Sequence, residues 1–447
     1  MQSRRKSRVE RKSCDVVVIG AGLGGLCVAA RLSHAGYKTV VLEKMPVVGG
    51  RFPWVHYKGH LIPTGALTIY YGHKDPVLLT LKEVGASTDF EMKALPPPKW
   101  RIKGKDYEMP PKGMLWYLIS LVSRNKEEEQ RVISALRRSF RWQVPSDSIT
   151  FSEWLLGITD NKDIWNIFQA WCVQIVGLNL YEVSAGDLVR CFVNFAGAQQ
   201  LVPVDGLNPV IDGLANVIRD SGGEVLTSVR VSKIMVGGGM VEGVLAQGPD
   251  FELQVEAKVV VSNVGPKKTV ELAGETNFDR GYLSEVREIR PLEGFWFIVS
   301  SEGPLYEWPG GLYAPESRRW QLGVDYSMVS PKFAPPGRNW MGFYQAPGHA
   351  SLYDPRKEYK LFLADLADMF PSFRERKAEV LLVRHFCSDW PCVRAWPAAS
   401  RHQKTPIENL YNVGDAVNPP GWMAGSGVAE GARMVAEEIK SRTKPGS

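Results

Sequence analysis

Residues 15–25 read Asp15-Val-Val-Val-Ile-Gly20-Ala-Gly22-Leu-Gly-Gly25, and this stretch decides the fold. The unbroken apolar run at 16–19 is typical of a strand buried on both faces of a parallel sheet. Gly20, Gly22 and Gly25 then follow with G-x-G-x-x-G spacing. In that pattern the first glycine permits a tight turn, the second lets the backbone approach a pyrophosphate, and the third lets a helix pack closely on the strand. The stretch therefore predicts the start of a dinucleotide-binding α/β domain.

The residues that follow complete the unit. Residues 26–35 are rich in Ala and Leu and predict a helix, with Gly36 as its C-cap. The N-terminus of such a helix offers free N–H groups and a positive dipole end to phosphates. Residues 39–42 predict a second strand, and Glu43 stands at its end, where a carboxylate accepts hydrogen bonds from ribose hydroxyls. Because the same charge repels a 2′-phosphate, Glu43 disfavours NADP. A glycine-rich turn of another α/β unit is the alternative, and the complete order of elements argues against it.

A second glycine-rich segment lies near the other end of the chain. It reads Tyr411-Asn-Val-Gly414-Asp415-Ala, and then Pro420-Gly421-Trp422-Met-Ala-Gly425-Ser-Gly427-Val428. We interpret it as the other half of the same pocket. The pair indicates that the chain wraps one long dinucleotide, FAD.

Family resemblance begins after Glu43, where the sequence continues Lys44-Met-Pro-Val-Val-Gly49-Gly50-Arg51. An acid, a short loop and Gly-Gly-Arg, together with Gly414-Asp415, resemble the flavoprotein superfamily of amine oxidases and phytoene desaturases. The resemblance implies that Arg51 lies along the FAD diphosphate, that Asp415 holds the ribityl chain, and that a helix starting near Gly427-Val428 faces the flavin N1/O2 edge. Reduced flavin gathers negative charge at that edge, which a helix N-terminus stabilises.

Three middle segments, 203–219, 222–234 and 257–266, extend this resemblance in the correct order. It implies a Rossmann-like FAD-binding domain of parallel sheet and helices, joined to an α+β substrate domain of mixed sheet and helices. Two departures, Asp205-Gly206 in place of the usual Gly-Gly and the stretch 419–425, set the chain apart from a plain carotenoid desaturase. The implied FAD ligands are Gly20, Gly22, Leu23, Gly24, Gly25, Glu43, Lys44, Gly49, Gly50, Arg51, Thr64, Gly65, Val231, Asn263, Gly414, Asp415, Gly427 and Val428.

The positions of these motifs divide the chain. A sequence of 447 residues is long for a single core and favours two joined domains. We expect a disordered basic tail at 1–13, an FAD-binding domain from 14–70, 200–290 and 385–447, and a substrate-binding domain from 71–199 and 291–384. The first insertion reads as mostly helical, with a capping box at Thr150-Phe-Ser-Glu153.

Composition limits the compartment and the partners. Hydrophobic residues make up 44% and charged residues 23%, which is ordinary for a soluble globular protein, and the scattered cysteines favour the reducing cytoplasm. Most of the net charge of +6 lies in the tail, where six basic residues face one acid. A basic arm of this kind either contacts anionic lipid or has no binding partner. It does not indicate nucleic-acid binding, because the sequence contains no nucleic-acid recognition domain. The six scattered cysteines predict reduced thiols, and the seven histidines show no metal spacing, so we expect no metal.

Residues 110–124 carry the apolar run Met114-Leu-Trp116-Tyr-Leu-Ile-Ser-Leu-Val122, flanked by Lys112 and Arg124. A helix of this kind is either a core element lining the substrate tunnel or a peripheral membrane contact with interfacial aromatics. Both interpretations stay open at this point.

No Ser-His-Asp, paired-carboxylate or metal constellation is visible, as expected where the cofactor performs the difficult step. The resemblance implies two aromatic side chains above the flavin, and Trp422 and Trp396 are the candidates, with simple packing as the alternative. Tyr70, Tyr71 and His73 follow residues 64–66, which the family brings near the flavin, and Tyr70 is our candidate for moving a proton there.

The motifs favour an FAD-dependent oxidoreductase that transfers hydride between flavin N5 and an apolar carbon skeleton, as an isoprenoid or lipid desaturase, saturase or isomerase. The alternative on the same fold is a flavin amine oxidase that oxidises a C–N bond of a small amine or amino acid. A non-catalytic flavin protein is disfavoured because the set of cofactor motifs is intact. The electron acceptor or donor and the oligomeric state follow from none of these motifs.

Overall fold

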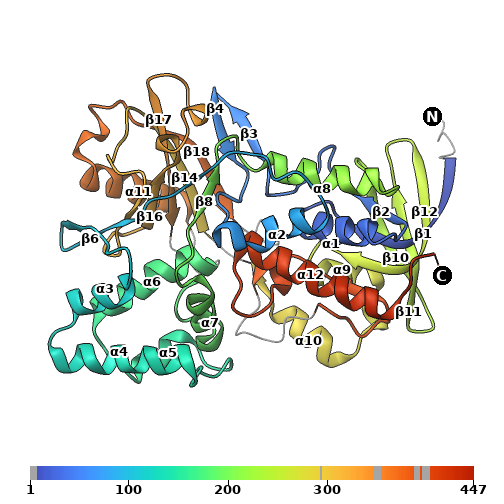
Figure 1. The fold of residues 1–447 in the computed structure, drawn as a ribbon, viewed down its shortest axis with the longest axis horizontal. Helices are drawn as coiled ribbons and strands as arrows, with labels where there is room; N and C mark the ends of the chain where they lie inside the picture. Colours follow the sequence, from blue (N-terminus) through green and yellow to red (C-terminus); the bar gives the residue numbers. More distant parts are fainter. Residues whose placement is uncertain (1–7, 292–293, 346–353, 387–392, 395–402, 447) are drawn as a thin grey trace.

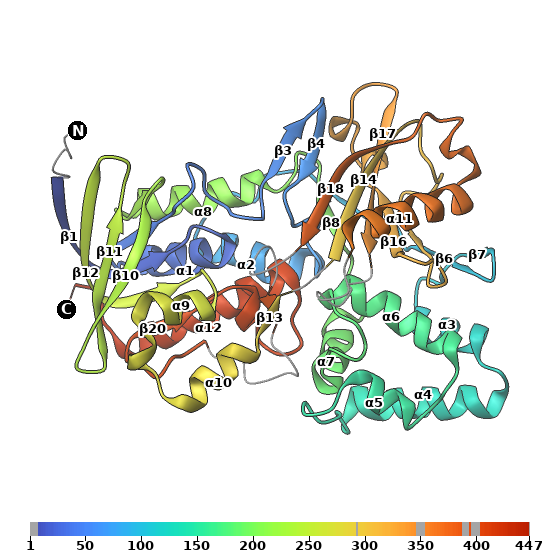
Figure 2. The same cartoon turned by 180° about the vertical axis from the view of Figure 1, so that it is seen from behind.

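The computed structural model describes residues 8–291, 294–345, 354–386, 393–394 and 403–446. Two lobes lie side by side (Figures 1 and 2). One lobe holds a sheet flanked by helices α1, α8 and α12. The other holds a second sheet with helix α11 on one side and the group α3–α7 below it.

The first sheet has seven strands in the order β10-β11-β12-β1-β2-β9, with β20 beside β12. Strands β1, β2, β9, β12 and β20 pair in parallel, and β10 and β11 form an antiparallel extension. The bounds are β1 (Arg8–Ile19), β2 (Thr39–Leu42), β9 (Glu224–Leu226), β10 (Arg230–Gly237), β11 (Met240–Gln247), β12 (Phe251–Ser262) and β20 (Leu410–Asn412). The packed helices are α1 (Leu23–His34), α8 (Asn208–Asp220) and α12 (Ala424–Arg442). The predicted Rossmann-like domain is confirmed.

The apolar run at the start of this sheet is buried as predicted. Val16 and Val18 join the core on one face of the sheet, whereas Val17 and Ile19 join the core on the other. The three valines have no exposed surface. Full burial of such a side chain stabilises the fold by about 1.5–3 kcal/mol.

The second sheet also has seven strands, in the order β18-β14-β17-β16-β15-β6-β7. Its strands come from both insertions: β6 (Lys99–Ile102), β7 (Lys105–Tyr107), β14 (Gly294–Glu302), β15 (Leu312–Tyr313), β16 (Trp320–Asp325), β17 (Arg338–Gln345) and β18 (Glu379–Phe386). Helix α11 (Pro355–Met369) covers one face, where the rings of Phe297 and Phe362 stack at 3.7 Å. The other face belongs to the core that continues into the first lobe.

A helical group completes the second lobe, with α3 (Met114–Val122), α4 (Lys126–Arg141), α5 (Phe151–Leu156), α6 (Lys162–Val176) and α7 (Ala185–Phe195). The predicted capping box of Thr150 and Glu153 is present at the start of α5. Helix α3 buries Leu118, Ile119 and Val122, while Tyr117 is exposed. Membrane contact through 110–124 therefore stays a prediction. Within the described residues, no helix is long and apolar enough to cross a membrane.

The remaining elements connect the lobes or cover their edges. They are β3 (Trp54–Tyr57), β4 (His60–Pro63), η1 (Gly72–Lys74), α2 (Pro76–Glu83), β5 (Met92–Ala94), β8 (Leu201–Pro203), α9 (Pro266–Ala273), α10 (Arg280–Glu288), β13 (Arg290–Pro291), β19 (Val393–Arg394) and η7 (Asp415–Val417). Strands β3 and β4 form a hairpin between the two lobes.

Two predicted boundaries differ from the structure. The expectation of a disordered tail at 1–13 is wrong for residues 8–13, which form the first half of β1 and pair in parallel with residues 251–256 of β12. The high charge of this segment is compatible with a strand because Arg11 is exposed and Lys12 reaches an ion pair with Glu224 at 2.6 Å. In addition, β18 crosses the predicted boundary between 384 and 385, so residues 385–386 extend the second sheet.

Candidate cofactor site

The predicted glycine turn lies between β1 and α1. Gly20 has a φ of 93°, and its N–H donates to the carbonyl of Leu42 at 2.8 Å. A Cβ atom at Gly25 would lie 2.0 Å from the carbonyl oxygen of Gly20, so the helix packs this closely only because the residue is glycine. Gly22 is the N-cap of α1, and no side chain caps the helix there. The first N–H groups of α1 have no intrahelical partner and suit a phosphate.

Asn263 joins the two ends of the chain at this turn. A Cβ atom at Gly22 would lie 2.7 Å from its side-chain nitrogen, and a Cβ atom at Gly24 or Gly414 would lie 2.9 Å from its side-chain oxygen. Gly22, Gly24 and Gly414, which come from the two ends of the described chain, therefore form one cradle that larger residues would fill.

Glu43 directly follows β2 and lies beside this cradle. Its side chain is 7% exposed, and its two oxygens accept from the backbone N–H groups of Ala21 and Met45, both at 2.8 Å. The carboxylate is thus fixed in position next to the glycine turn. Each of its oxygens keeps a lone pair for a ribose hydroxyl.

The Gly49-Gly50-Arg51 segment closes over the turn. Gly49 pairs with Gly22 in a parallel bridge and donates its N–H to the carbonyl of Ala21 at 2.7 Å. Arg51 forms an ion pair with Asp415 at 2.8 Å, and both side chains are partly or largely buried. The residue expected at the diphosphate and the residue expected at the ribityl chain are therefore in contact with each other.

The C-terminal half of the cradle comes from β20 and α12. Strand β20 adds to β12 in parallel, which brings Gly414 to the turn. Helix α12 packs along α1, as both views show (Figures 1 and 2), and the Val428 side chain would lie 3.0 Å from a Cβ atom at Gly24. The N-termini of α1 and α12 thus lie at one place, and α12 begins at Ala424, three residues before the predicted start near Gly427.

The other predicted ligands lie farther out. Leu23 is buried in the first turn of α1, and Lys44 is exposed beside Glu43. The N–H of Val229 donates to the Glu43 carbonyl at 2.8 Å, which places Val231 two residues along β10. A Cβ atom at Gly65 would lie 2.6 Å from the carbonyl oxygen of Arg51, and Thr64 precedes it.

A cradle without room for Cβ atoms, a fixed carboxylate and two helix N-termini fit an adenine dinucleotide such as FAD. The individual role of each predicted ligand stays a prediction.

Of the three predicted flavin-facing side chains, Trp422 and Tyr70 lie within the described residues. Trp422 is partly buried and packs its ring edge against Tyr71, with centroids 5.1 Å apart. Tyr70 is also partly buried, and its N–H donates to Asp75 at 3.1 Å. Trp396 lies outside the described residues. Burial raises the pKa of Tyr71, so its phenol stays protonated at neutral pH.

Asp75 holds this region together, and it is absent from the predicted site. Its carboxylate is fully buried and accepts from the N–H groups of Tyr70, Tyr71 and Val77 and from the hydroxyl of Ser426 at 2.6 Å. It therefore ties the tyrosine pair to the first turn of α12. Burial raises its pKa, against the opposing effect of these hydrogen bonds.

The face of the second sheet opposite α11 carries a row of in-register side chains. Because directly opposed residues on neighbouring strands point to the same side, one row crosses the sheet. Its members are Arg384 on β18, Trp296 on β14, Tyr344 on β17, Leu322 on β16, Tyr313 on β15 and Trp100 on β6. Trp296, Leu322, Tyr313 and Trp100 are buried, whereas Arg384 and Tyr344 are partly exposed. We name this set the aromatic row.

Arg384 ends the aromatic row beside the predicted site segment. Its guanidinium donates to the carbonyls of Thr64 and of Pro63, the latter at 2.9 Å, and lies over the Trp296 ring at 5.3 Å. No carboxylate in the described part of the chain forms an ion pair with it. Burial lowers its pKa to about 10, so it remains a cation at neutral pH.

Phenols gather at the centre of the same face. The hydroxyls of Tyr326 and Tyr344 lie 3.3 Å apart. Burial raises the pKa of Tyr344, and so do the neighbouring phenols of Tyr326, Tyr70 and Tyr313. Tyr70 from the first lobe therefore lies close to three phenols of the second lobe, and burial raises the pKa of each of those three.

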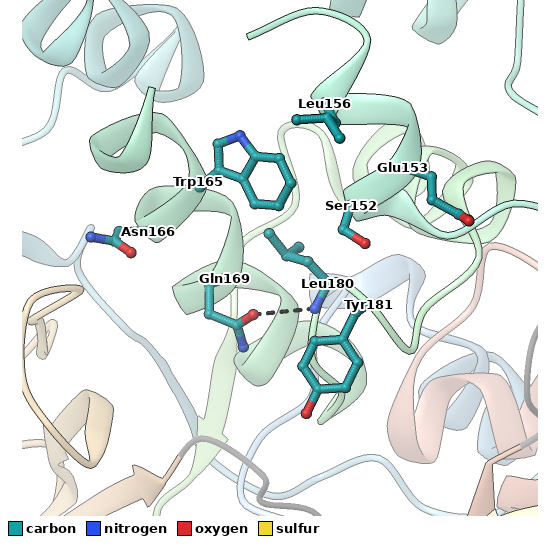
Figure 3. Close-up of a pocket in the computed structure, with 8 residues that line it drawn as sticks. All are labelled: Ser152, Glu153, Leu156, Trp165, Asn166, Gln169, Leu180 and Tyr181. Atoms are coloured by element: carbon teal, nitrogen blue, oxygen red, sulfur yellow. Dashed lines mark hydrogen bonds between the residues drawn. The ribbon is translucent and has the colours of Figure 1, made fainter. Parts of the chain in front are cut away.

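One pocket is separate from all of these residues. It has a volume of about 380 Å³ and lies between α5, α6 and the segment Leu180–Tyr181, lined by Trp165, Gln169 and their neighbours (Figure 3). Gln169 accepts from the N–H of Leu180 at 3.1 Å across it. None of its lining residues belongs to the predicted site. Across the residues that the structure describes, no cluster of His, Cys, Asp and Glu could hold a metal ion.

Comparison with known proteins gives a consistent result. A family model described as flavin containing amine oxidoreductase matches residues 23–439. A crystal structure of an oxidoreductase from Methanosarcina mazei superposes with a TM-score of 0.83 at 27% identity, covering 95% of this chain and 100% of that one.

Two relatives match over most of their length. An uncharacterized protein of Methanocaldococcus jannaschii is 25% identical over 433 residues, which is 95% of this chain and 99% of the relative. The 15-cis-phytoene desaturase of Narcissus pseudonarcissus is 23% identical over 478 residues, which is 97% of this chain and 81% of the relative.

Proposed function

The chain belongs to the flavin-containing amine oxidoreductase family and is an FAD-dependent oxidoreductase, and on that premise we propose that it transfers hydride between the flavin and an apolar carbon skeleton. The reaction would be that of a desaturase, saturase or isomerase on an isoprenoid or lipid-like compound. When bound, FAD supplies the hydride acceptor or donor. The similarity to a plant phytoene desaturase supports this substrate class.

The observation that carries the proposal is the apolar face of the second sheet. Trp296, Leu322 and Tyr313 belong to the same continuous core as α1 and the glycine turn. A substrate that lies between the lobes would therefore meet aromatic and aliphatic side chains, which bind apolar skeletons and exclude water. The chain's own part in catalysis would be to position the substrate and keep the site dry.

Arg384 counts against the alternative, oxidation of a small amine. Amines of this class are protonated at neutral pH, and an ammonium group about 6 Å from a guanidinium would be repelled by about 3 kcal/mol at an effective dielectric constant of about 20. The described residues of the aromatic row offer no carboxylate to offset this repulsion. Because the family is described as amine oxidoreductases, amine oxidation is the alternative that the experiment must test.

The test is anaerobic bleaching of the flavin's visible band in the purified holoprotein. One panel contains isoprenoids and other apolar alkenes and ketones, and the other contains primary and secondary amines. We expect bleaching by a member of the apolar panel. If neither panel bleaches the flavin, dithionite-reduced protein is mixed with the unsaturated compounds, and reoxidation would establish a saturase. Bleaching by amines alone would contradict the proposal.

A further inference from the structure

Hydrogen-bond donors of three residues on the aromatic row lack an acceptor within the described part of the chain: some N–H groups of Arg384 and the indole N–H groups of Trp296 and, at the far end of the row, Trp100. The guanidinium of Arg384 has five N–H groups, and the carbonyls of Pro63 and Thr64 account for two. The indole N–H of Trp296 is buried with no hydrogen-bond partner. Trp296 and Arg384 are directly opposed on β14 and β18, so both donors belong to the same end of the row.

An unpaired cation in this position is costly. Removing a charge from water disfavours the fold unless an opposite charge or several hydrogen bonds compensate for it. The lowered pKa of Arg384 reflects this cost. Other arginines of the same sheet are compensated, since Arg338 pairs with Glu379 at 3.2 Å and Arg101 pairs with Asp106 at 2.6 Å.

The rest of the row is aromatic and aliphatic, with the phenol groups of Tyr344 and Tyr313 at its centre. From β18 to β6 it crosses five strand spacings, or about 24 Å. Trp296, Leu322, Tyr313 and Trp100 continue it from Arg384, and Trp171 of α6 packs against Trp100 with centroids 5.2 Å apart. Cationic charge at one end and aromatic surface beyond it match a molecule with one anionic end and a long apolar body.

We propose that the substrate is an amphiphile whose anionic end, a carboxylate or a phosphate, binds to Arg384 while its apolar body lies along the face of the aromatic row. This inference rests on the proposed function and narrows its substrate class, because a pure hydrocarbon would leave the guanidinium without a counter-charge. A charge-assisted hydrogen bond of this kind raises affinity by about 10- to 150-fold.

The first experiment is a binding titration of the FAD-loaded protein with cis-parinaric acid, a fluorescent polyene carboxylate, and with its methyl ester. The two probes share the apolar body and differ in the charge. We expect the acid to bind about 10- to 150-fold more tightly than the ester. Equal affinities for acid and ester would overturn the proposal without recourse to any variant.

Variants assign the preference to one side chain. Arg384→Met should remove most of the preference for the acid and leave ester affinity unchanged, whereas Arg384→Lys, which keeps the charge, should retain part of it. Arg338→Met is the matched control, since it removes an arginine of the same sheet that already has a carboxylate partner, and it should keep the full preference. An Arg384→Met protein that loses acid and ester equally would indicate a packing role and refute the assignment.

Two further measurements separate the remaining outcomes. Competition by geranylgeranyl diphosphate against geranylgeraniol identifies a phosphate end, and competition by retinoic acid against retinol identifies a carboxylate end. If Arg384→Met shifts the flavin midpoint potential and leaves the ratio of acid to ester affinity unchanged, the guanidinium acts on the flavin and not on the substrate. That result would overturn the proposal. Failure of the proposed function is distinct, because it appears as bleaching by amines whatever the probes show.

Discussion

Asp75→Asn should destabilise the protein by about 2–4 kcal/mol, although the two side chains have the same shape. In the structure Oδ2 accepts from the N–H groups of Tyr70 and Tyr71, both at 3.1 Å, and from Ser426, while Oδ1 accepts from Val77 at 2.8 Å. An amide has one acceptor oxygen, so in either orientation its NH2 group faces at least one N–H donor. At least one buried hydrogen bond to a charged group is lost, at about 1.5–3 kcal/mol, and the facing donors add to this cost.

The control is the same substitution at another helix start. Asp279 is exposed and accepts one bond, from the N–H of Tyr282 at 2.9 Å. Because Asn caps a helix about as well as Asp, Asp279→Asn should change stability by less than about 0.5 kcal/mol. Both variants are compared with the wild type by urea unfolding at a fixed excess of FAD, followed by flavin fluorescence and far-UV circular dichroism. If Asp75→Asn unfolds at the same urea concentration as Asp279→Asn, the assignment of Asp75 as the tie between the tyrosine pair and α12 is refuted.

Three further predictions concern the cofactor, pH and the first strand. Glu43→Ala and Asp415→Ala should each weaken FAD binding by about 10- to 100-fold. The first variant removes the carboxylate fixed by Ala21 and Met45, and the second leaves Arg51 without its ion pair. The flavin-to-protein ratio after gel filtration measures FAD binding, and full occupancy in both variants would contradict the site. Burial raises the pKa of Asp325 to about 6, so the folded state binds this proton more tightly than the unfolded chain does, and stability falls as pH rises from about 4 through about 6. Between pH 5 and pH 7 the wild type should lose about 1.4 kcal/mol relative to Asp325→Asn in urea unfolding, and parallel curves for the two proteins would be evidence against it. Deleting residues 1–13 should lower the free energy of unfolding by about 1–3 kcal/mol because residues 8–13 pair with β12. Deleting residues 1–7 alone is the control, since it removes charge without removing that pairing. If residues 8–13 were disordered, the two deletions would have equal urea midpoints.

The parts of the molecule that sequence predicts well are those encoded by neighbouring residues. The glycine turn, α1 and Glu43 lie within 30 residues, and each has a local physical requirement, such as the absence of a Cβ atom at Gly25. The capping box of α5 is equally local. Asp75 belongs to this class too, since an Asp before Pro76 is a helix-start signal that would have drawn attention to it.

Other features depend on pairings that no short stretch contains. The aromatic row requires the register of six strands, two of which carry an irregularity, between Ile298 and Val299 on β14 and between Trp320 and Leu322 on β16. Arg384 acquires its role because residues 320 positions earlier in the chain place two carbonyls beside it. The only local signal is a lone arginine at the end of the apolar run 380–383. The strand at 8–13 cannot be predicted locally for the same reason. Its charge composition does not reveal that β12 has an edge with which residues 8–13 can pair.

Because Gly24 and Gly414 share one asparagine, a ribosome must synthesise the chain beyond residue 414 before a nascent chain can retain its flavin. The first strand, turn and helix emerge early, but strand β20, helix α12 and Asp415, which pairs with Arg51, emerge only after the second lobe. Long-range closure of this kind is slow compared with local folding. Flavin capture would then report that synthesis has passed helix α12, and a product terminated before residue 410 would present an exposed edge of β12 to quality-control proteases.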